Sequence, residues 1–576
     1  MPIALSGLAV SKGIAIGKAR VIQHGQLDIA EYVLPAKHIE DEVARFNHAL
    51  EQAREQLRII RKQIPEQTPQ DIAAFIDTHL LMLQDEALSR APVELIRQHQ
   101  CNAEWALKMQ QDALVQVFDA MEDPYLRTRR DDVEHVVRRV QQILLSEEQQ
   151  SGALESDKDE PRIILAIDLA PSDMVQLNSR HVVAIVTERG GPLSHTAILA
   201  RSLGIPALVG VPHVHQYVHN DEQLIIDANN GSLLLEADEA TLKHYRSLQR
   251  SEQKARRDLY KIKGQKSHSL DGTAITLHAN IELSEDITAL KRVGAAGVGL
   301  YRTEFLFMNR EAPPDENEQY QTYRNALQRL KGLPLTIRTL DLGADKEIIP
   351  GATACTNPAL GLRAIRLCLK EPELFLPQLR AILRASAKGK VRLLIPMLTS
   401  VQELSQALAL IEQAKASLRR GNKAFDPKIP IGAMIEVPAA AICADLFAER
   451  LDFLSIGTND LMQYTLATDR VDETVNHLFD PLNPGVLRLI HGVIKAGHKA
   501  KIPVSMCGEM AGDTRYTRLL LALGLREFSM PPASLLEVKR LVCESDVTKL
   551  QRKVGKLMAS ANPAATAVEL GLIGRG

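Results

Sequence analysis

The feature that most constrains the fold is a regular alternation of apolar, β-type runs with helical patterns in the second half of the chain. Eight such runs occur, at residues 277–281, 297–302, 335–341, 391–397, 431–437, 451–457, 504–507 and 527–530. Parallel strands buried on both faces are continuous apolar runs, and a crossover helix must separate each strand from the next. Eight β-then-α repeats over residues 265–576 predict a (β/α)₈ TIM barrel, whose active site forms at the carboxyl ends of the strands.

Polar and charged residues stand where these predicted strands end. They are Arg302, Asp341, Glu436, Asn459, Asp460 and Cys507, and the third predicted strand also holds Arg338. A single charged residue is most often only solvated, but the carboxyl ends of all barrel strands meet at one face, so we expect these side chains to share one site. Arginines present planar, bidentate donors that suit phosphate and carboxylate groups. Glu436 and Asp460 offer the hard oxygen ligands that usually hold Mg²⁺ beside a substrate phosphate.

The first half of the chain combines strand patterns with a long helical tract. Residues 1–20 alternate apolar and small residues, which predicts a strand region or a hairpin. Apolar residues recur at the 3.6-residue period in residues 43–60 and 72–83 and predict two helices of an all-α insert. His79, on the apolar face of the second helix, is interpreted as a core or interface histidine. Farther on, apolar runs and the turn signal Asn230-Gly231 predict an α/β unit.

We therefore predict an α/β multidomain protein with four parts. A polar, helix-forming stretch with few large apolar residues separates the two halves and predicts a connecting helix. The predicted parts are an α/β domain at 1–20 plus 148–240, an all-α helical insert at 21–147, a linker helix at 241–264 and the TIM barrel at 265–576.

A glycine turn followed by a helical pattern is the most informative segment of the predicted α/β domain. It reads Gly190-Gly191-Pro192-Leu193-Ser194-His195-Thr196-Ala197. The glycines permit a tight turn, and Ser194 can cap the helix that follows. His195 would then lie at a helix N-terminus, where unpaired amides and the helix dipole favour an anion such as a phosphoryl group. We interpret His195 as a phosphoryl acceptor rather than as an ordinary buried histidine in a turn.

Composition excludes several classes of function. Lys and Arg number 69 and Asp and Glu number 71, so the net charge is −2 and there is no basic excess for nucleic acid or for an anionic membrane. Residues 1–20 lack the pattern of a signal peptide, and no run approaches the roughly 18 apolar residues of a membrane span. We expect a cytoplasmic enzyme. The six scattered cysteines form no CxxC pair or Cys/His cluster, so neither a disulfide framework nor a structural zinc site is expected.

Taken together, the motifs resemble those of enzyme I of the bacterial phosphoenolpyruvate-dependent sugar phosphotransferase system. In the barrel region the matching stretches are GVGLYRTEFLFM (297–308), RTLDLGADK (338–346), NPALGLRAIR (357–366), IGAMIEVPAA (431–440), DFLSIGTNDLMQYTLATDR (452–470) and MCGEMAGD (506–513). GGPLSHTAILARSLGIPALVG (190–210) resembles the phosphohistidine signature of phosphoenolpyruvate-utilising proteins. DTHLLMLQDEAL (77–88) resembles the helical domain that receives the carrier protein HPr. So many matches in the family's order are highly specific.

The resemblance implies a role for each matching residue. His195 would accept the phosphoryl group of phosphoenolpyruvate and pass it to a histidine of HPr, releasing pyruvate, as the first step of sugar uptake. Cys507 would protonate the enolate, and Glu436 and Asp460 would bind Mg²⁺. The implied substrate-binding residues are Arg302, Arg338, Asn459, Arg470, Lys346 and Arg363. The family also implies a homodimer that pairs through the barrel domain.

Three alternatives stand beside this resemblance. Pyruvate phosphate dikinase and phosphoenolpyruvate synthase share the histidine domain and the barrel but need a nucleotide-binding domain, and the chain has neither the length for one nor a G-x-x-x-x-G-K-[ST] loop. An enzyme I paralogue that phosphorylates a regulatory HPr-like protein is the alternative function. A scaffold that binds partners without turnover is the alternative outside the enzymes. The chain departs from the family's pattern at Leu193, Leu362, Ala344 and Pro531.

Overall fold

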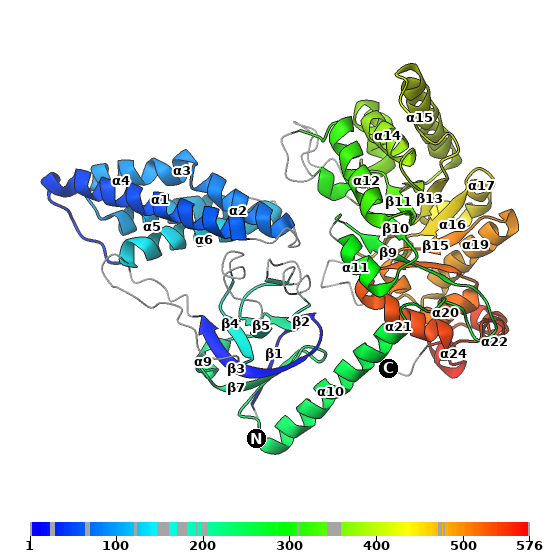
Figure 1. Ribbon diagram of the computed structural model, residues 1–576, viewed down its shortest axis with the longest axis horizontal. Coiled ribbons are helices and arrows are strands. Elements are labelled where there is room, and N and C mark those ends of the chain that lie inside the picture. Colours follow the sequence, from blue (N-terminus) through cyan, green and yellow to red (C-terminus); the bar gives the residue numbers. More distant parts are fainter. Residues whose placement is uncertain are drawn as a thin grey trace. The chain divides into compact units, whose positions relative to one another are not determined.

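The computed structural model divides the chain into two units, residues 1–255 and 256–576. It describes residues 3–22, 29–63, 70–119, 124–146, 160–169, 181–191, 194, 196–197, 200, 204–282, 284, 286–307, 312–342, 357, 359–469, 475 and 478–573. Each unit contains one sheet of eight strands (Figure 1).

The sheet of the second unit is a closed barrel of parallel strands, which confirms the predicted TIM barrel. Its strands are β9 (Thr276–Ile281), β10 (Val298–Tyr301), β11 (Leu335–Arg338), β12 (Val391–Ile395), β13 (Ile431–Ile435), β14 (Phe453–Ile456), β15 (Val504–Met506) and β16 (Glu527–Met530). β16 closes the barrel on β9, with Glu527 opposite Thr276. All carboxyl ends of the strands therefore open at one face.

The third predicted strand extends to Asp341, whereas β11 ends at Arg338. Beyond Arg338, the backbone N–H of Leu340 donates to the side chain of Gln378 and that of Asp341 donates to Glu304. These side chains replace a neighbouring strand as hydrogen-bond partners, so the strand stops before the apolar pattern does.

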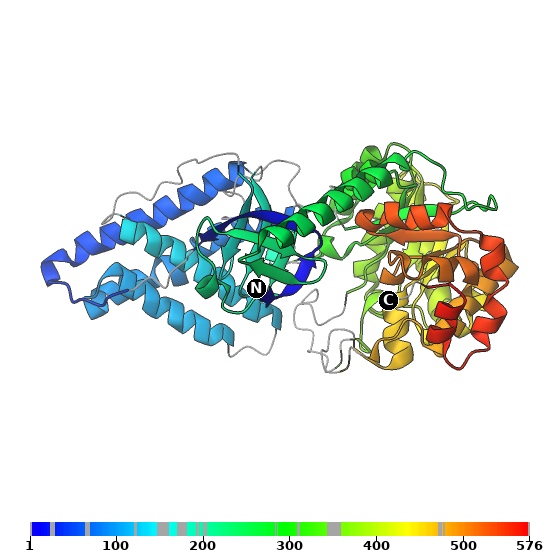
Figure 2. The same cartoon turned by 90° about the horizontal axis from the view of Figure 1, so that it is seen from below.

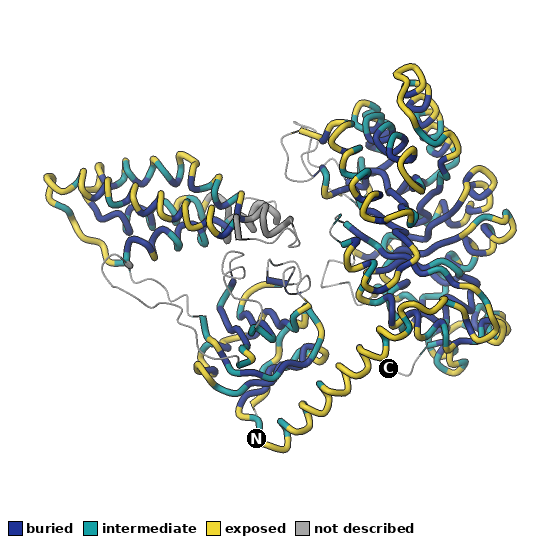
Figure 3. The backbone as a smooth tube through the Cα atoms, viewed as in Figure 1, coloured by how far each residue is buried: buried dark blue, intermediate teal, exposed yellow. Residues whose placement is uncertain are grey.

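Helices surround the barrel strands on the outside (Figures 1 and 2). They are α11 (Asp286–Val293), α12 (Glu316–Leu330), α13 (Ala364–Lys370), α14 (Pro372–Ser386), α15 (Val401–Arg420), α16 (Pro438–Ile442), α17 (Ala444–Ala448), α18 (Thr458–Leu466), α19 (Pro484–Ala500), α20 (Thr517–Leu523), α21 (Pro532–Cys543), α22 (Val547–Gln551), α23 (Val554–Met558) and α24 (Pro563–Glu569), with 3₁₀ turns η2 (Glu304–Leu306) and η4 (Glu509–Ala511). Their apolar faces and the strands form one continuous core, so the barrel strands are buried (Figure 3).

The first unit has a sheet with the order β1-β8-β7-β3-β4-β5-β6-β2. Its strands are β1 (Ile3–Ser6), β2 (Leu8–Ser11), β3 (Ile14–Ile22), β4 (Arg162–Ala166), β5 (Val182–Thr187), β6 (Ala207–Val209), β7 (Gln223–Asp227) and β8 (Ser232–Leu235). β1 and β2 lie at opposite edges although only Gly7 separates them in the chain. Because consecutive Cα atoms are only about 3.8 Å apart, the two edges come together and the sheet curls.

Two turn predictions for this sheet have different outcomes. The predicted strand region is confirmed by β1, β2 and β3, but the hairpin alternative is wrong because β1 pairs with β8 and β2 pairs with β6. The Asn230-Gly231 signal is confirmed, since it joins antiparallel β7 and β8. Gly231 has φ +71°, a left-handed conformation that glycine adopts without a Cβ penalty.

A helical bundle is inserted between β3 and β4. Its helices are α1 (Ile39–Gln63), α2 (Gln70–Met82), α3 (Glu86–Ser89), α4 (Ala91–His99), α5 (Ala103–Asp119) and α6 (Pro124–Ser146), after a 3₁₀ turn η1 (Ala36–His38). The long helices lie side by side in both views (Figures 1 and 2). The buried side chains that join them include Phe46, Leu57, Ile76, Leu107 and Val137.

The short helix α9 (Val214–Tyr217) and the long helix α10 (Glu239–Lys261) complete the first half. Most of α10 is exposed (Figure 3), as expected of a connecting helix with few large apolar residues. Among the helices that the structure describes, none is both long and apolar enough to cross a membrane.

Candidate active site

Arg338, the last residue of β11, is the centre of a buried ion-pair network at the carboxyl ends of the barrel strands. Its Nη2 lies 3.0 Å from Oε1 of Glu304, and its Nη1 lies 2.9 Å from Oδ2 of Asp341. Burial alone would lower the pKa of Arg338, but the negative charges of Glu304 and Asp341 raise it above its ordinary value. The guanidinium is therefore a permanent cation held between two carboxylates.

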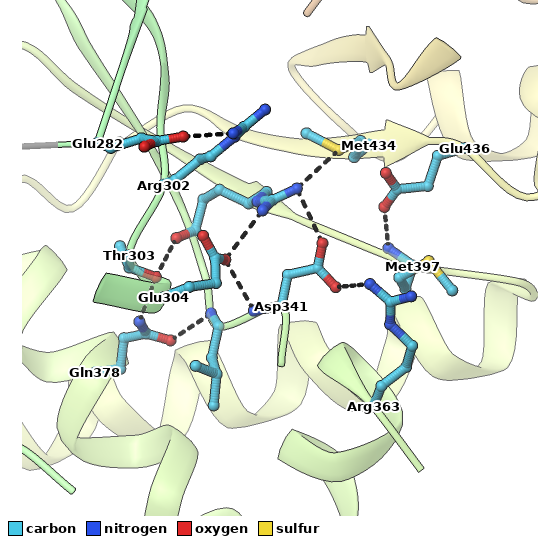
Figure 4. Close-up of polar contacts among 12 residues, drawn as sticks. Glu282, Arg302, Thr303, Glu304, Asp341, Arg363, Gln378, Met397, Met434 and Glu436 are labelled. Carbon is cyan, nitrogen blue, oxygen red and sulfur yellow. Dashed lines mark hydrogen bonds and ion pairs between the residues drawn. The ribbon is translucent and has the colours of Figure 1, made fainter. Parts of the chain in front are cut away.

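Asp341 brings a second arginine into this network. Arg363 Nη2 donates to Asp341 Oδ1 at 2.9 Å. Burial opposes ionisation of Asp341, yet the charges of Arg338 and Arg363 hold the pKa of Asp341 below its ordinary value. Arg302, directly after β10, adds to this effect and is itself paired with Glu282 (Figure 4). Three of the predicted arginines thus act on one region of the barrel mouth.

Neutral side chains fix the backbone around the network. Gln378 of α14 donates through Nε2 to Thr303 Oγ1 at 3.1 Å, and Thr303 Oγ1 donates to the carbonyl oxygen of Arg338 at 2.9 Å. The same Gln378 accepts from the N–H of Leu340 at 2.9 Å. Thr303 and Gln378, which lie next to each other in Figure 4, together hold the backbone at the end of β11 in place.

Glu436, directly after β13, is 1% exposed. Its Oε1 accepts from the backbone N–H of Met397 at 2.7 Å. Burial, and then the negative charges of Asp460 and Asp341, raise the pKa of Glu436 well above its ordinary value. Gly457 leaves the space that this carboxylate occupies, because a Cβ there would lie 2.7 Å from Oε2 of Glu436. The negative charges of Asp460 and Asp341 are thus concentrated around Glu436, which is the environment of a cation site.

Cys507, directly after β15, lies inside the barrel. It belongs to an apolar cluster with Leu300, Leu394, Met434 and Phe453. Ser455 Oγ donates to Cys507 Sγ at 3.2 Å. Burial raises the pKa of the Cys507 thiol to about 11. At neutral pH the group is therefore protonated and is able to act as an acid.

Amide side chains connect the loops that follow neighbouring strands. Asn459 donates through Nδ2 to Glu509 Oε1 and accepts through Oδ1 from the N–H of Glu509, both at 3.0 Å. Asn280 of β9 donates to the carbonyl oxygen of Cys507 at 3.0 Å and accepts from Ser529 Oγ at 2.6 Å. Both pairs orient polar groups at the barrel mouth.

The structure places most of the predicted site residues at the ends of barrel strands, directly after them, or at the start of a helix that follows one. These are Arg302, Arg338, Arg363, Glu436, Asn459, Asp460 and Cys507. His195, Lys346 and Arg470 lie outside the described residues. Sequence reasoning missed Asn280 and Gln378. The strand-end rule applies equally to Asn280, but Gln378 lies within a helix, where no sequence signal marks it.

The glycine turn of the first unit follows β5. Ser194 Oγ accepts from the N–H of Ala197 at 3.3 Å, the contact that a helix N-cap makes. Gly190 has φ +103°, a conformation that requires glycine. The turn and the cap therefore follow the prediction on either side of position 195.

Comparison with known proteins gives matches along the chain. Residues 256–547 match the family described as PEP-utilising enzyme, PEP-binding domain. Residues 6–129 match PEP-utilising enzyme, N-terminal, and residues 158–231 match PEP-utilising enzyme, mobile domain.

A phosphoenolpyruvate-protein phosphotransferase of Cupriavidus necator is 45% identical to this chain over 100% of both proteins. The chain belongs to the phosphoenolpyruvate-protein phosphotransferase family. Other members include those of Priestia megaterium, 41% identical over 93% of both proteins, and Bacillus subtilis, 40% identical over 95% of both. Membership in the phosphoenolpyruvate-protein phosphotransferase family confirms the resemblance that the motifs indicate, and with it the prediction of a phosphotransferase enzyme.

Proposed function

We propose that this chain transfers the phosphoryl group of phosphoenolpyruvate to its own His195, and then to a histidine of HPr or an HPr-like carrier, with release of pyruvate. The proposal rests chiefly on the arginine network around Asp341. This network lies close to Glu436 and Cys507, because the charge of Arg338 acts on the pKa of both residues. One barrel face thus carries cations for a phosphate, oxygen ligands for a metal and a proton donor for an enolate.

Two buried donors support an anionic ligand at this network. Among the described residues, Nε of Arg338 and Nε of Arg363 are buried and have no hydrogen-bond partner. Buried polar groups are nearly always paired, so such donors call for a partner that binds later. Phosphate and carboxylate oxygens are the acceptors that guanidinium groups fit best. We assign Arg338 and Arg363, with Arg302, Lys346, Asn459 and Arg470, to phosphoenolpyruvate binding.

The chemical step divides between His195 and Cys507. The bond between phosphorus and the enol oxygen breaks, and a bond forms between phosphorus and a ring nitrogen of His195. The electron pair left on the enolate takes the proton of the Cys507 thiol at carbon, which gives pyruvate and a thiolate. Ser455, which donates to Sγ, stabilises that thiolate. The arginines counter the charge on the phosphoryl and enolate oxygens.

The residues present fit Mg²⁺ as the cofactor. Glu436, directly after β13, and Asp460, in the first turn of α18 after β14, are hard oxygen ligands. The pKa of Glu436 is raised first by burial and then by the negative charges of Asp460 and Asp341, and a divalent cation relieves the crowding of these charges. When bound, the ion neutralises charge on phosphoryl and enolate oxygens. We assign Glu436 and Asp460 to holding it.

The remaining assignments follow the family resemblance. We propose that the helical insert at 21–147 receives the carrier, that the α/β domain at 1–20 plus 148–240 carries His195, and that the barrel at 265–576 pairs two copies in the cytoplasm. A regulatory HPr-like protein is the alternative acceptor to HPr, and supplying each purified carrier to the phosphorylated enzyme separates the two.

Incubation with labelled phosphoenolpyruvate and Mg²⁺ tests the acceptor. We expect an acid-labile, base-stable label on the wild type and none on His195→Ala. His213→Ala is the matched control, because His213 is an exposed histidine of the same unit, and its labelling should equal that of the wild type. Equal labelling of His195→Ala would assign the phosphoryl group to another residue.

A further inference from the structure

A cluster of metal-ligating side chains lies in the helical bundle of the first unit. His79 projects from α2, and Asp132 and His135 project from α6. One ligand atom from each of the three residues lies within 4.8 Å of the others. His79 and Asp132 are each 2% exposed. The phosphotransfer chemistry of the barrel does not use this cluster.

The helices bring these ligands together by their geometry. Asp132 and His135 are three residues apart, so they lie on the same face of α6. A carboxylate and a histidine at this spacing, projecting into the interior of a helical bundle, is an arrangement by which bundle proteins hold metal ions. α2 packs against α6 and adds His79 from the opposite side.

The separation of His79 and Asp132 suits a metal better than a direct hydrogen bond. Nε2 of His79 lies 3.4 Å from Oδ1 of Asp132, which is longer than the 2.7–3.2 Å typical of an N–H···O bond. Two ligands bound at about 2.0–2.1 Å in a tetrahedral site lie roughly 3.3–3.4 Å apart. The third ligand atom, within 4.8 Å, needs only a small side-chain movement to complete the set.

A second carboxylate supports the site from outside. Nε2 of His135 lies 3.3 Å from Oδ2 of Asp168, which follows β4. Histidines that bind metals usually donate their other ring N–H to a carboxylate, which fixes the ring and increases its basicity. The Asp168 side chain is 32% exposed, so the cluster is close to solvent on this side.

We propose that His79, Asp132 and His135 bind one transition-metal ion of the Zn²⁺ type, with water as the fourth ligand and Asp168 orienting His135. Two imidazoles and one carboxylate favour Zn²⁺ over Mg²⁺, which prefers all-oxygen sites such as the pair Glu436 and Asp460. The ion cross-links α2 to α6. The site is separate from the proposed phosphoenolpyruvate site, since no residue of the barrel takes part.

Metal binding by the full-length chain tests the proposal. The protein used for all measurements, the background protein, carries Glu436→Gln, Asp460→Asn and Cys443→Ser. These substitutions remove the two barrel carboxylates and an exposed thiol, a group that coordinates zinc in proteins generally. We expect one Zn²⁺ per chain to survive dialysis. Co²⁺ added to the metal-free protein should give the visible absorption bands of tetrahedral Co²⁺ without a thiolate band.

Single substitutions in this background locate the ion. His79→Gln and Asp132→Asn should each lower the affinity at least 100-fold, and Asp168→Asn should lower it about 10–100-fold, as expected of a residue that orients a ligand. His99→Gln, an exposed histidine of the same bundle, should leave it unchanged. The proposal fails if the background protein retains no Zn²⁺, or if binding survives in Asp132→Asn. Far-UV circular dichroism checks that each variant is folded. If His79→Gln unfolds, the nearly isosteric variants Asp132→Asn and Asp168→Asn test whether the cluster binds the ion.

Discussion

The ion pairs of Asp341 allow a prediction of stability that does not depend on the reaction. Asp341→Asn keeps the shape of the side chain but removes the carboxylate charge from Arg338 and Arg363, both of which it contacts at 2.9 Å. Breaking a buried ion pair costs about 3–5 kcal/mol. Arg338 retains Glu304, and the Arg363 side chain is 18% exposed, so we expect a loss near the lower limit, roughly 3 kcal/mol.

Differential scanning calorimetry of the full-length chain at pH 7 measures this loss. A domain of 150–250 residues shifts by about 2–4 °C per kcal/mol, and the barrel unit, residues 256–576, is larger, so the lower value applies and its transition should fall by roughly 6 °C. Because the pKa of Asp341 is below its ordinary value of about 3.9, its contribution is complete above pH 4 and is lost as the pH falls below that. The transition temperatures of the wild type and Asp341→Asn should therefore approach each other as the pH falls below 4.

Glu569→Gln is the matched control for Asp341→Asn. Lys556 and Glu569 form an ion pair at 2.7 Å, but their side chains are 62% and 65% exposed. An exposed pair is screened by water and contributes less than about 1 kcal/mol, so the melting temperature should change little. If the melting temperature of Asp341→Asn falls no further than that of Glu569→Gln, burial does not explain the contribution of the Asp341 ion pairs to stability, and the argument is refuted.

Three further predictions concern Cys507 and His278. Cys507→Ser should fold but form pyruvate about 10²–10⁴-fold more slowly in a single-turnover assay, because general acid catalysis supplies a factor of that size; unchanged turnover removes the acid role. Burial raises the pKa of Cys507 to about 11, so the thiol stays protonated between pH 8 and 10. Deprotonation of Cys507 should therefore not slow pyruvate formation in this range. A decline in rate centred at the ordinary thiol pKa of about 8.5 would contradict the prediction. Burial, with the charge of Arg392, lowers the pKa of His278 to about 4 from its ordinary 6.5, so its contribution to stability is present above pH 6.5 and is lost as the pH falls toward 4. Between pH 7 and 5, the free energy of unfolding measured with urea should fall by up to about 2 kcal/mol more in the wild type than in His278→Gln. Identical pH profiles of the two proteins would show that protonation of His278 does not affect stability.

The barrel could be predicted from the sequence because each of its strands is buried on both faces and is therefore an unbroken apolar run. The point at which a strand ends could not be predicted so well. The N–H of Thr339 still donates to Leu394 of β12, but those of Leu340 and Asp341 donate to the side chains of Gln378 and Glu304, and neither side chain is near β11 in the chain. Pairing in the other sheet is likewise a long-range property. β1 and β2 are neighbours in sequence, but their partners β8 and β6 lie about 200 residues farther along.

The candidate site was predictable to the extent that its residues follow strands. Arg302, Glu436 and Cys507 each come directly after one, and topology then brings them to the same face. The cluster in the helical bundle has no such rule. His79 and Asp132 are 53 residues apart on separate helices, so no ligand spacing appears in the sequence, and the apolar face that carries His79 predicts a core histidine equally well.

The arginine network also shows how stability and ligand binding can oppose each other in one group of residues. Asp341 and Glu304 balance the charge of Arg338, but they leave its Nε and that of Arg363 without hydrogen-bond partners among the described residues. Each buried donor left unpaired costs the free protein about 1–3 kcal/mol. Donors that are already desolvated and fixed by their carboxylates need little reorganisation when an anion arrives, which is the condition under which charge stabilisation is strongest. The carboxylates are therefore as necessary to the proposed phosphate site as the arginines, because without them the fold could not hold two guanidinium groups in place before the ligand binds.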